Sequence, residues 1–263
     1  MLATLLAALA SFGVLAVVFI PLERVFPARP GQPLLRPAFR LDALFFFGQY
    51  LLWSALATSV LRFADVRLLA HVAVGLRAWM RAQPAWLHVA FALALGDLLM
   101  YWWHRACHHF DVLWRFHAVH HSSTHLDWLA AHREHPLDGV TTQLMMNLPA
   151  LVLGVRFEVV ASVAVLRGMW AIFVHSNVRL PLGPLRVLLG APELHHFHHA
   201  LTERTAHNFA NLAPWLDILF GTYHCPPQDV AERYPLGVPG APPRGYLAHI
   251  LLPLLPSLRR RRG

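Results

Sequence analysis

The feature that most constrains this chain is a series of long apolar stretches with almost no charged residues. Residues 1–22 and 43–61 carry no charge, and a third stretch from about 85 to 103 contains one acid, Asp97. About 20 apolar residues are enough for a helix to cross a bilayer. The chain is 14% charged, against about 25% in soluble domains. Its mean hydropathy of +0.44 therefore excludes a water-soluble globule with a polar surface.

Shorter apolar stretches complete the predicted membrane architecture. Residues 139–155 and 159–174, separated by Arg156, Phe157 and Glu158, predict a helical hairpin that enters and leaves the bilayer. The Arg-bearing segment 62–81 and the proline-containing segment 245–258 predict surface helices.

These stretches together define a fold class. Residues 1–22 lack a basic start and a cleavage site, which favours an anchor helix over a cleaved signal peptide. We therefore predict an all-α integral membrane helical bundle with about four to five spans or hairpin segments. We expect a single membrane domain over 1–263.

Charge predicts the orientation and the kind of partner. The net charge is +8, and the basic tail Arg259–Arg262 follows several arginines in the C-terminal third. Positive charge favours the cytoplasmic side, so we expect a bacterial inner-membrane protein with this end inside. Contact with anionic lipid or an acidic partner protein is favoured over nucleic acid. Two cysteines, Cys107 and Cys225, cannot form a disulfide framework.

Histidine is the unusual residue: 16 of the 19 histidines lie between His104 and His224. Eight of them form three clusters spaced by three or four residues: His104 and His108; His117, His120 and His121; His195, His198 and His199. On helices, such spacing places the imidazoles of each cluster on one face. Neutral imidazole binds iron, zinc, copper or nickel. Eight ligands are too many for one ion but suit two.

Several common kinds of histidine-containing site fit this pattern less well. Structural zinc sites close with four ligands and usually include cysteine, and haem needs one or two axial ligands. The H-E-x-x-H pattern of zinc proteases is absent from the sequence. A metal transporter would place polar residues inside several spans. A single histidine near a membrane is usually interfacial or hydrogen-bonded, but eight clustered ones indicate a function.

The order of these clusters resembles the fatty acid hydroxylase/sterol desaturase superfamily of integral-membrane di-iron oxygenases. H-x-x-x-H is followed by two H-x-x-H-H boxes, and the resemblance covers about residues 90–225. The flanking sequence also matches, in the segments 97–105, 115–122, 134–138 and 208–222. The resemblance implies a helical bundle with a cytosolic histidine-rich helical cap. It also implies two non-haem irons, O2 as co-substrate and hydroxylation of a fatty acyl, sterol or related lipid C–H bond.

The resemblance also assigns individual residues. It carries the ligand role to the eight clustered histidines and to a ninth, His175; the position four residues earlier, which holds a further histidine in some members, is Ala171. His109, His125, His132 and His196 are expected not to bind metal and, at most, to contact the ligands. A non-catalytic relative would be expected to lose box residues, and all three boxes are intact.

The remaining expectations concern the acid that orients a histidine, the source of electrons and the alternative functions. Asp97, seven residues before His104, is the acid we predict to orient a ligating histidine; Glu134, Asp138, Glu193 and Asp217 are the other acids near the boxes. The sequence contains no haem, flavin or iron–sulfur motif, so a separate ferredoxin or cytochrome b5-like protein is expected to supply electrons. Desaturation on the same scaffold and a non-enzymatic membrane metal-binding or transport protein are the alternatives.

Overall fold

The computed structural model describes residues 2–202, 204–227, 234–240 and 245–255, and the regular secondary structure among them is helical. They contain two isolated β-bridges and no strand, which confirms the all-α class. The basic tail, Arg259–Arg262, lies outside the described residues. The α-helices are α1 (Leu2–Val25), α2 (Phe39–Gly48), α3 (Ser54–Phe63), α4 (Val74–Arg81), α5 (Ala85–His109), α6 (Asp111–His121), α7 (Pro136–Val152), α8 (Phe157–His175), α9 (Arg186–Leu189), α10 (Pro192–His198), α11 (Trp215–Leu219) and α12 (Tyr246–Leu251).

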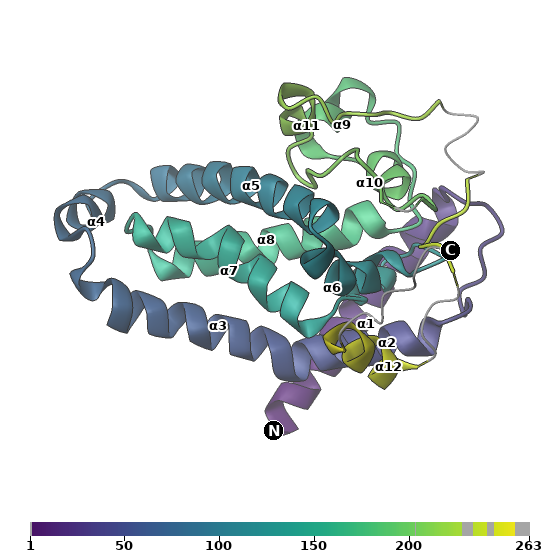
Figure 1. Cartoon of the computed structure of the whole chain (residues 1–263), viewed down its shortest axis with the longest axis horizontal. Coiled ribbons are helices and arrows are strands. Elements are labelled where there is room, and N and C mark those ends of the chain that lie inside the picture. The colour runs from purple at the N-terminus through teal and green to yellow at the C-terminus, as the bar shows by residue number, and fades with distance from the viewer. Residues whose placement is uncertain (1, 203, 228–233, 241–244, 256–263) are drawn as a thin grey trace.

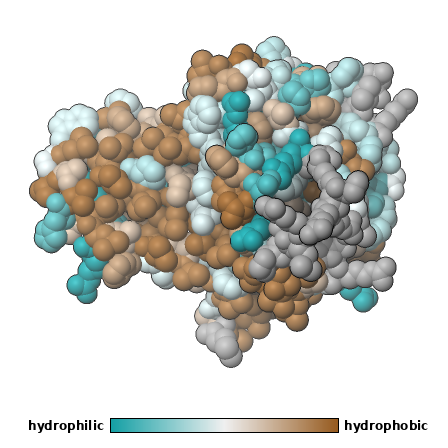
Figure 2. Space-filling view, in the orientation of Figure 1, coloured by the Kyte–Doolittle hydropathy of each residue, from teal (hydrophilic) through white to brown (hydrophobic). Residues whose placement is uncertain are grey.

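Four helices, α3, α5, α7 and α8, lie side by side along the long axis of the molecule (Figure 1). The short helix α4 closes one end of this bundle, and α6 and α10 lie at the other, which we call the histidine end. Apolar residues from α3 to α8, including Met80, Ala92, Leu151 and Val160, form the core near α4. Hydrophobic residues also cover much of the outer surface of the bundle (Figure 2). Such a surface is suited to lipid rather than water.

Four helical stretches are long and apolar enough to cross a membrane: Leu2–Val25, Phe39–His71, Ala85–His109 and Phe157–His175. They confirm the predicted class of integral membrane bundle. The second stretch joins α2 and α3 through a π-helical turn, Gln49–Trp53, and is longer than the predicted span 43–61.

The prediction of a surface helix over 62–81 was therefore partly wrong, because the second helix continues past Arg62. Its charges have partners that allow this continuation. Arg62 lies over the Phe157 ring at 4.9 Å and 3.8 Å from Glu158, and Asp65 lies 2.7 Å from Arg77.

The predicted hairpin is present as α7 and α8, joined by a tight turn. Gly154 has a φ of +93°, and a Cβ there would lie 2.6 Å from the Arg77 backbone, so the turn requires glycine. The segment predicted at the interface is described only over residues 245–255. This part contains α12, which packs on α2, where the Tyr246 and Phe45 ring centroids are 4.8 Å apart.

A buried ion cluster joins three segments at the histidine end. The Arg36 guanidinium donates to Asp127 at 2.6 Å and lies 2.7 Å from Asp42, which also accepts from Arg133 at 2.6 Å. Asp127 in turn accepts from the backbone N–H of Ala130. The cluster thereby fixes the segment 122–135 against α2 and the loop that precedes it.

A second ion pair lies inside the bundle. Arg167 of α8 donates to Asp97 of α5 at 3.0 Å and to the carbonyls of Ala92 and Leu93. A Cβ at residue 96 would lie 2.5 Å from the Arg167 guanidinium, so Gly96 provides the space for it. Because both side chains are mostly buried, the pair joins two helices that carry histidines at their ends.

We expect Arg167→Leu to lower the free energy of unfolding by about 3–5 kcal/mol, because it leaves Asp97 buried without its partner. The double variant Asp97→Leu/Arg167→Leu should recover most of this loss, since no charge then remains unpaired. Denaturant unfolding of detergent-purified protein measures both. An equal loss in the single and double variants would show that the pair does not carry this stability.

Candidate metal centre

Four helices bring the predicted histidines together at one end of the bundle. His104 and His108 lie in the last turns of α5, and His175 is the last residue of α8. Phe110, with extended backbone, reverses the chain between α5 and α6. The other two clusters lie on α6 and at the end of α10: His117, His120, His121, His195, His198 and His199.

The nine predicted ligands divide into two groups. In each group, one nitrogen from every ring lies within 4.8 Å of the others. Group one contains His104, His108, His117, His121 and His198, and group two contains His120, His175, His195 and His199. The structure thus brings all nine together, in a division that their spacing along the chain does not predict.

Hydrogen bonds on the outer side of group one determine which nitrogen faces inward. The Nδ1–H groups of His104 and His198 donate to the carbonyls of Phe209 and His207, both at 2.7 Å. The Nδ1–H of His117 donates to the Asp138 carboxylate at 2.8 Å. The Nε2 atoms of these three rings are then unprotonated, and they are buried without a partner. Free imidazole lone pairs that point at one another are the pattern of metal ligands.

Group two gives a stronger indication of a cation site. His120 and His175 donate their Nδ1–H groups to the carbonyls of Arg133 and Ala171, so both Nε2 atoms carry lone pairs. These two Nε2 atoms are only 3.0 Å apart, and His175 Nε2 is 2.9 Å from His195 Nε2. Two lone pairs at this distance repel unless a proton or a metal ion lies between them. The residues present therefore fit a metal ion.

Burial keeps these imidazoles in the neutral form that binds metal. Removal from water and the neighbouring histidines lower the pKa of His121, His195 and His199 well below the usual range. Burial lowers the pKa of His198 to about 3. A lowered pKa means that the uncharged ring persists at neutral pH, with its lone pair available.

The acids near the site have partners of different kinds. Asp97 accepts from Arg167, and its orientation of a histidine stays a prediction. Asp138 accepts from His117, and the buried Cys107 lies 3.9 Å from the same carboxylate. Asp138 follows His135-Pro136 in the sequence, but nothing in its spacing indicates that α7 meets α6 there, so its contact with a ligand ring was not predicted.

Asn208 holds the carbonyls that orient two histidines of group one. Its φ is +57°, a left-handed conformation that asparagine tolerates better than most residues. Its side chain donates to Leu194 and His224 carbonyls and accepts from the His224 N–H. The adjacent His207 and Phe209 carbonyls therefore both point at ligand rings. Asp217 adds support by accepting from the Phe209 N–H at 2.8 Å.

Two of the histidines expected not to bind metal have structural hydrogen bonds. His196 donates through Nε2 to the Ser176 carbonyl at 3.0 Å, which joins α10 to the end of α8. His132 donates through Nδ1 to Gln49 Oε1 at 2.9 Å.

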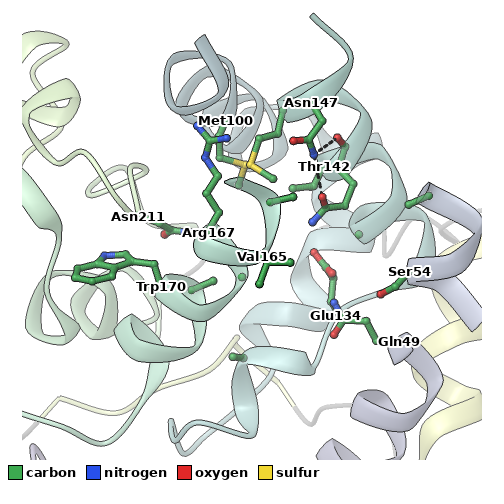
Figure 3. Close-up of a pocket in the computed structure, with 18 of the residues that line it drawn as sticks. Gln49, Ser54, Met100, Glu134, Thr142, Asn147, Val165, Arg167, Trp170 and Asn211 are labelled. Atoms are coloured by element: carbon green, nitrogen blue, oxygen red, sulfur yellow. Dashed lines mark hydrogen bonds between the residues drawn. The ribbon is translucent and has the colours of Figure 1, made fainter. Parts of the chain in front are cut away.

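A cavity of about 530 Å³ is lined by histidines of the site and by residues inside the bundle, some of which are shown in Figure 3. Its wall includes members of both groups, and it continues between α3 and α8 along small and apolar residues. The histidines that line it are His104, His117, His120, His175 and His195, and the apolar wall includes Ala57, Leu61, Val160, Ala161 and Ala164. The site is therefore open toward an apolar space among the membrane helices.

Comparison with known proteins identifies a family. Residues 89–222, about half of the chain, match the family described as fatty acid hydroxylase. An ornithine lipid hydroxylase of Rhizobium tropici is 30% identical over 177 residues, which are 66% of this chain and 53% of that protein.

Other lipid enzymes match over shorter stretches. An alkylglycerol monooxygenase of Danio rerio is 31% identical over 55% of this chain and 31% of its own length. A Delta(7)-sterol 5(6)-desaturase of Gibberella zeae is 30% identical over 54% of this chain and 39% of its own length. The chain thus spans about half or less of these relatives, and no solved structure matches it.

We expect the purified protein to hold two transition-metal ions per chain. His198→Ala should remove the ion of group one and His120→Ala that of group two, each leaving about one ion. Elemental analysis by mass spectrometry measures the content, with the exposed His109→Ala as the control that keeps both ions. Full metal content in both ligand variants would contradict the assignment.

Asn208→Ala should weaken metal binding in group one by roughly 10–100-fold, as loss of the groups that orient a ligand generally does. Asn208→Gly should lose less affinity, because glycine adopts the positive φ without strain. Competition with a graded series of chelators measures the affinity of each site. An equal loss from both groups would indicate general unfolding instead of a local effect on the two carbonyls.

Proposed function

The chain belongs to the fatty acid hydroxylase family, and from this membership we propose that it is a membrane-bound di-iron oxygenase. In this proposal it uses O2 and external electrons to hydroxylate a C–H bond of a membrane lipid. The observation that carries the proposal is the pair of imidazole groups opening into an apolar cavity. Desaturation is the second candidate, supported by the similarity to a sterol desaturase.

Iron is the metal proposed for both groups. Imidazole suits iron, zinc, copper and nickel alike, and the family favours iron. Two irons held by these groups would supply the reduction of O2 to an oxidant strong enough to attack an unactivated C–H bond. The nine histidines hold both ions close to one cavity, so that one bound lipid meets both groups.

The remaining residues hold the substrate and the ligands in position. The apolar wall between α3 and α8 takes a lipid chain and excludes water from it. Asp138 and the carbonyls of Phe209, His207, Arg133 and Ala171 keep the protons of five rings on their outer nitrogens. Each neutral ring would therefore present the lone pair of its inner nitrogen to a metal ion.

Orientation in the membrane is proposed from the arginines. Five arginines lie at the α4 end of the bundle or in the turn between α7 and α8: Arg62, Arg67, Arg77, Arg81 and Arg156. More lie in the segments at the histidine end: Arg24, Arg29, Arg36, Arg40, Arg105, Arg115, Arg133, Arg179, Arg186 and Arg204. The excess of positive charge supports a histidine end facing the cytoplasm of a bacterial inner membrane. There a ferredoxin or cytochrome b5-like protein would deliver electrons.

The reaction can be tested by isotope labelling. Membranes containing the chain, supplied with reductant under 18O2, should form a hydroxylated lipid whose new oxygen carries the label. Comparative lipid analysis of cells with and without the chain identifies the product, and mass spectrometry locates the label. Product oxygen derived from labelled water, or turnover that persists without O2, would contradict the mechanism.

A further inference from the structure

The cavity contains a carboxyl whose presence the metal centre does not require. The two acids in its wall are Asp97, which pairs with Arg167, and Glu134. Among the described residues, Glu134 has no hydrogen bond and no ion pair; the neighbouring Arg133 turns away to Asp42. Figure 3 shows the Glu134 carboxyl pointing into the cavity. An ionisable group inside a membrane bundle is costly, and the cost is usually accepted for a function.

The fold makes a specific place for this carboxyl. A Cβ at residue 139 would lie 2.5 Å from Glu134 Oε2, so Gly139 leaves a notch in the first turn of α7 that accommodates it. Burial and the neighbouring Asp138 raise the pKa of Glu134 to about 8. The group can therefore accept a hydrogen bond from a neutral donor, or ionise when a cation binds beside it.

Other polar residues of the wall are paired with one another, as Asp97 is with Arg167 and Asn147 with Gln143, whereas the stretch between α3 and α8 is lined mainly by apolar residues. Gln49 and Ser54 line the same side of the cavity as Glu134 (Figure 3). From there the cavity extends between α3 and α8 toward Phe157, at the opposite end of the bundle from the histidines. An unpaired carboxyl at one end of the cavity, with an apolar stretch leading away from it, matches the polar end and the chain of a lipid.

We propose that Glu134 binds the hydrogen-bond donor, a hydroxyl or an ammonium, at the polar end of the lipid substrate. The chain of that lipid then lies between α3 and α8. Because Glu134 shares its end of the cavity with His117 and His120, the carbon that reacts lies close to the polar end and not far along the chain. This inference rests on the proposed function and adds the substrate's polar group and the region of attack.

Binding without turnover tests the proposal separately from the reaction. Full-length protein in detergent, without reductant, is titrated with octadecan-1-ol, octadecylamine and 1-methoxyoctadecane, and affinity is measured by ligand-induced thermal stabilisation. The ether has the same long chain but no donor. We expect the alcohol, the amine or both to bind about tenfold or more tightly than the ether, as a hydrogen bond to a carboxylate implies.

Variants identify the residue responsible. Glu134→Leu should abolish the preference over the ether. Glu134→Gln should keep a preference for the alcohol, because an amide oxygen still accepts, but lose any preference for the amine. Glu158→Leu removes an exposed carboxyl outside the cavity and should change nothing. Gly168→Leu should weaken the binding of all three lipids alike. Gly168 lines the cavity, and no atom lies within 4 Å of a Cβ placed there, so the larger side chain has room to occupy space that a lipid would fill.

The outcomes separate the possible polar groups. Tighter binding of the amine indicates an ammonium at the polar end, and tighter binding of the alcohol indicates a hydroxyl. Equal affinity for all three lipids in the unaltered protein, or a preference that survives Glu134→Leu, would overturn the proposal. The isotope experiment would be unaffected by either result. If Glu134→Leu does not fold, the unaltered protein and Glu134→Gln still decide the question.

Discussion

The constraint that governs the histidine end of this protein is the repulsion between imidazole lone pairs that point at one another. His120 and His175 point their unprotonated Nε2 atoms at each other across 3.0 Å, which is unfavourable unless a cation lies between them. Nine uncharged imidazoles packed together at the end of an apolar bundle would destabilise the fold if no metal ion were bound to them. The metal ions that we propose turn this repulsion into coordination. They would therefore stabilise the histidine end as well as supply its chemistry.

Several layers of structure hold the rings in this arrangement. Backbone carbonyls accept the outer protons of His104, His120, His175 and His198. The buried cluster around Asp42 and Arg36 fixes the segment that contains the Arg133 carbonyl. Asn208 fixes the turn that contains two more of these carbonyls, those of His207 and Phe209. Some of these partners are far apart in the sequence: His104 and Phe209 are separated by 105 residues, and Asp42 and Arg133 by 91. The site therefore forms only when these distant segments have come together.

The sequence predicted the apolar helices and the meeting of eight histidines at one site, because both depend on local patterns, whereas His175 was expected from the family resemblance alone. Apolar length indicates a span, and spacing by three or four residues indicates a shared helix face. The sequence did not predict that the second helix passes Arg62, since the contact of Arg62 with the Phe157 ring joins segments far apart in the chain. Nor did it predict the contacts of Asp138, Asn208 and Glu134, whose roles depend on which helices meet. Asp97 has a suggestive spacing from His104, yet its contact is with Arg167, a residue of another helix.

Two separate metal sites formed by nine histidines are central to the function that we propose. Diffraction from crystals of the metal-loaded protein, with anomalous differences collected at the iron edge, tests for them directly. We expect two peaks, one among His104, His108, His117, His121 and His198, and the other among His120, His175, His195 and His199. A single peak shared by all nine, or iron bound elsewhere in the chain, would contradict this division.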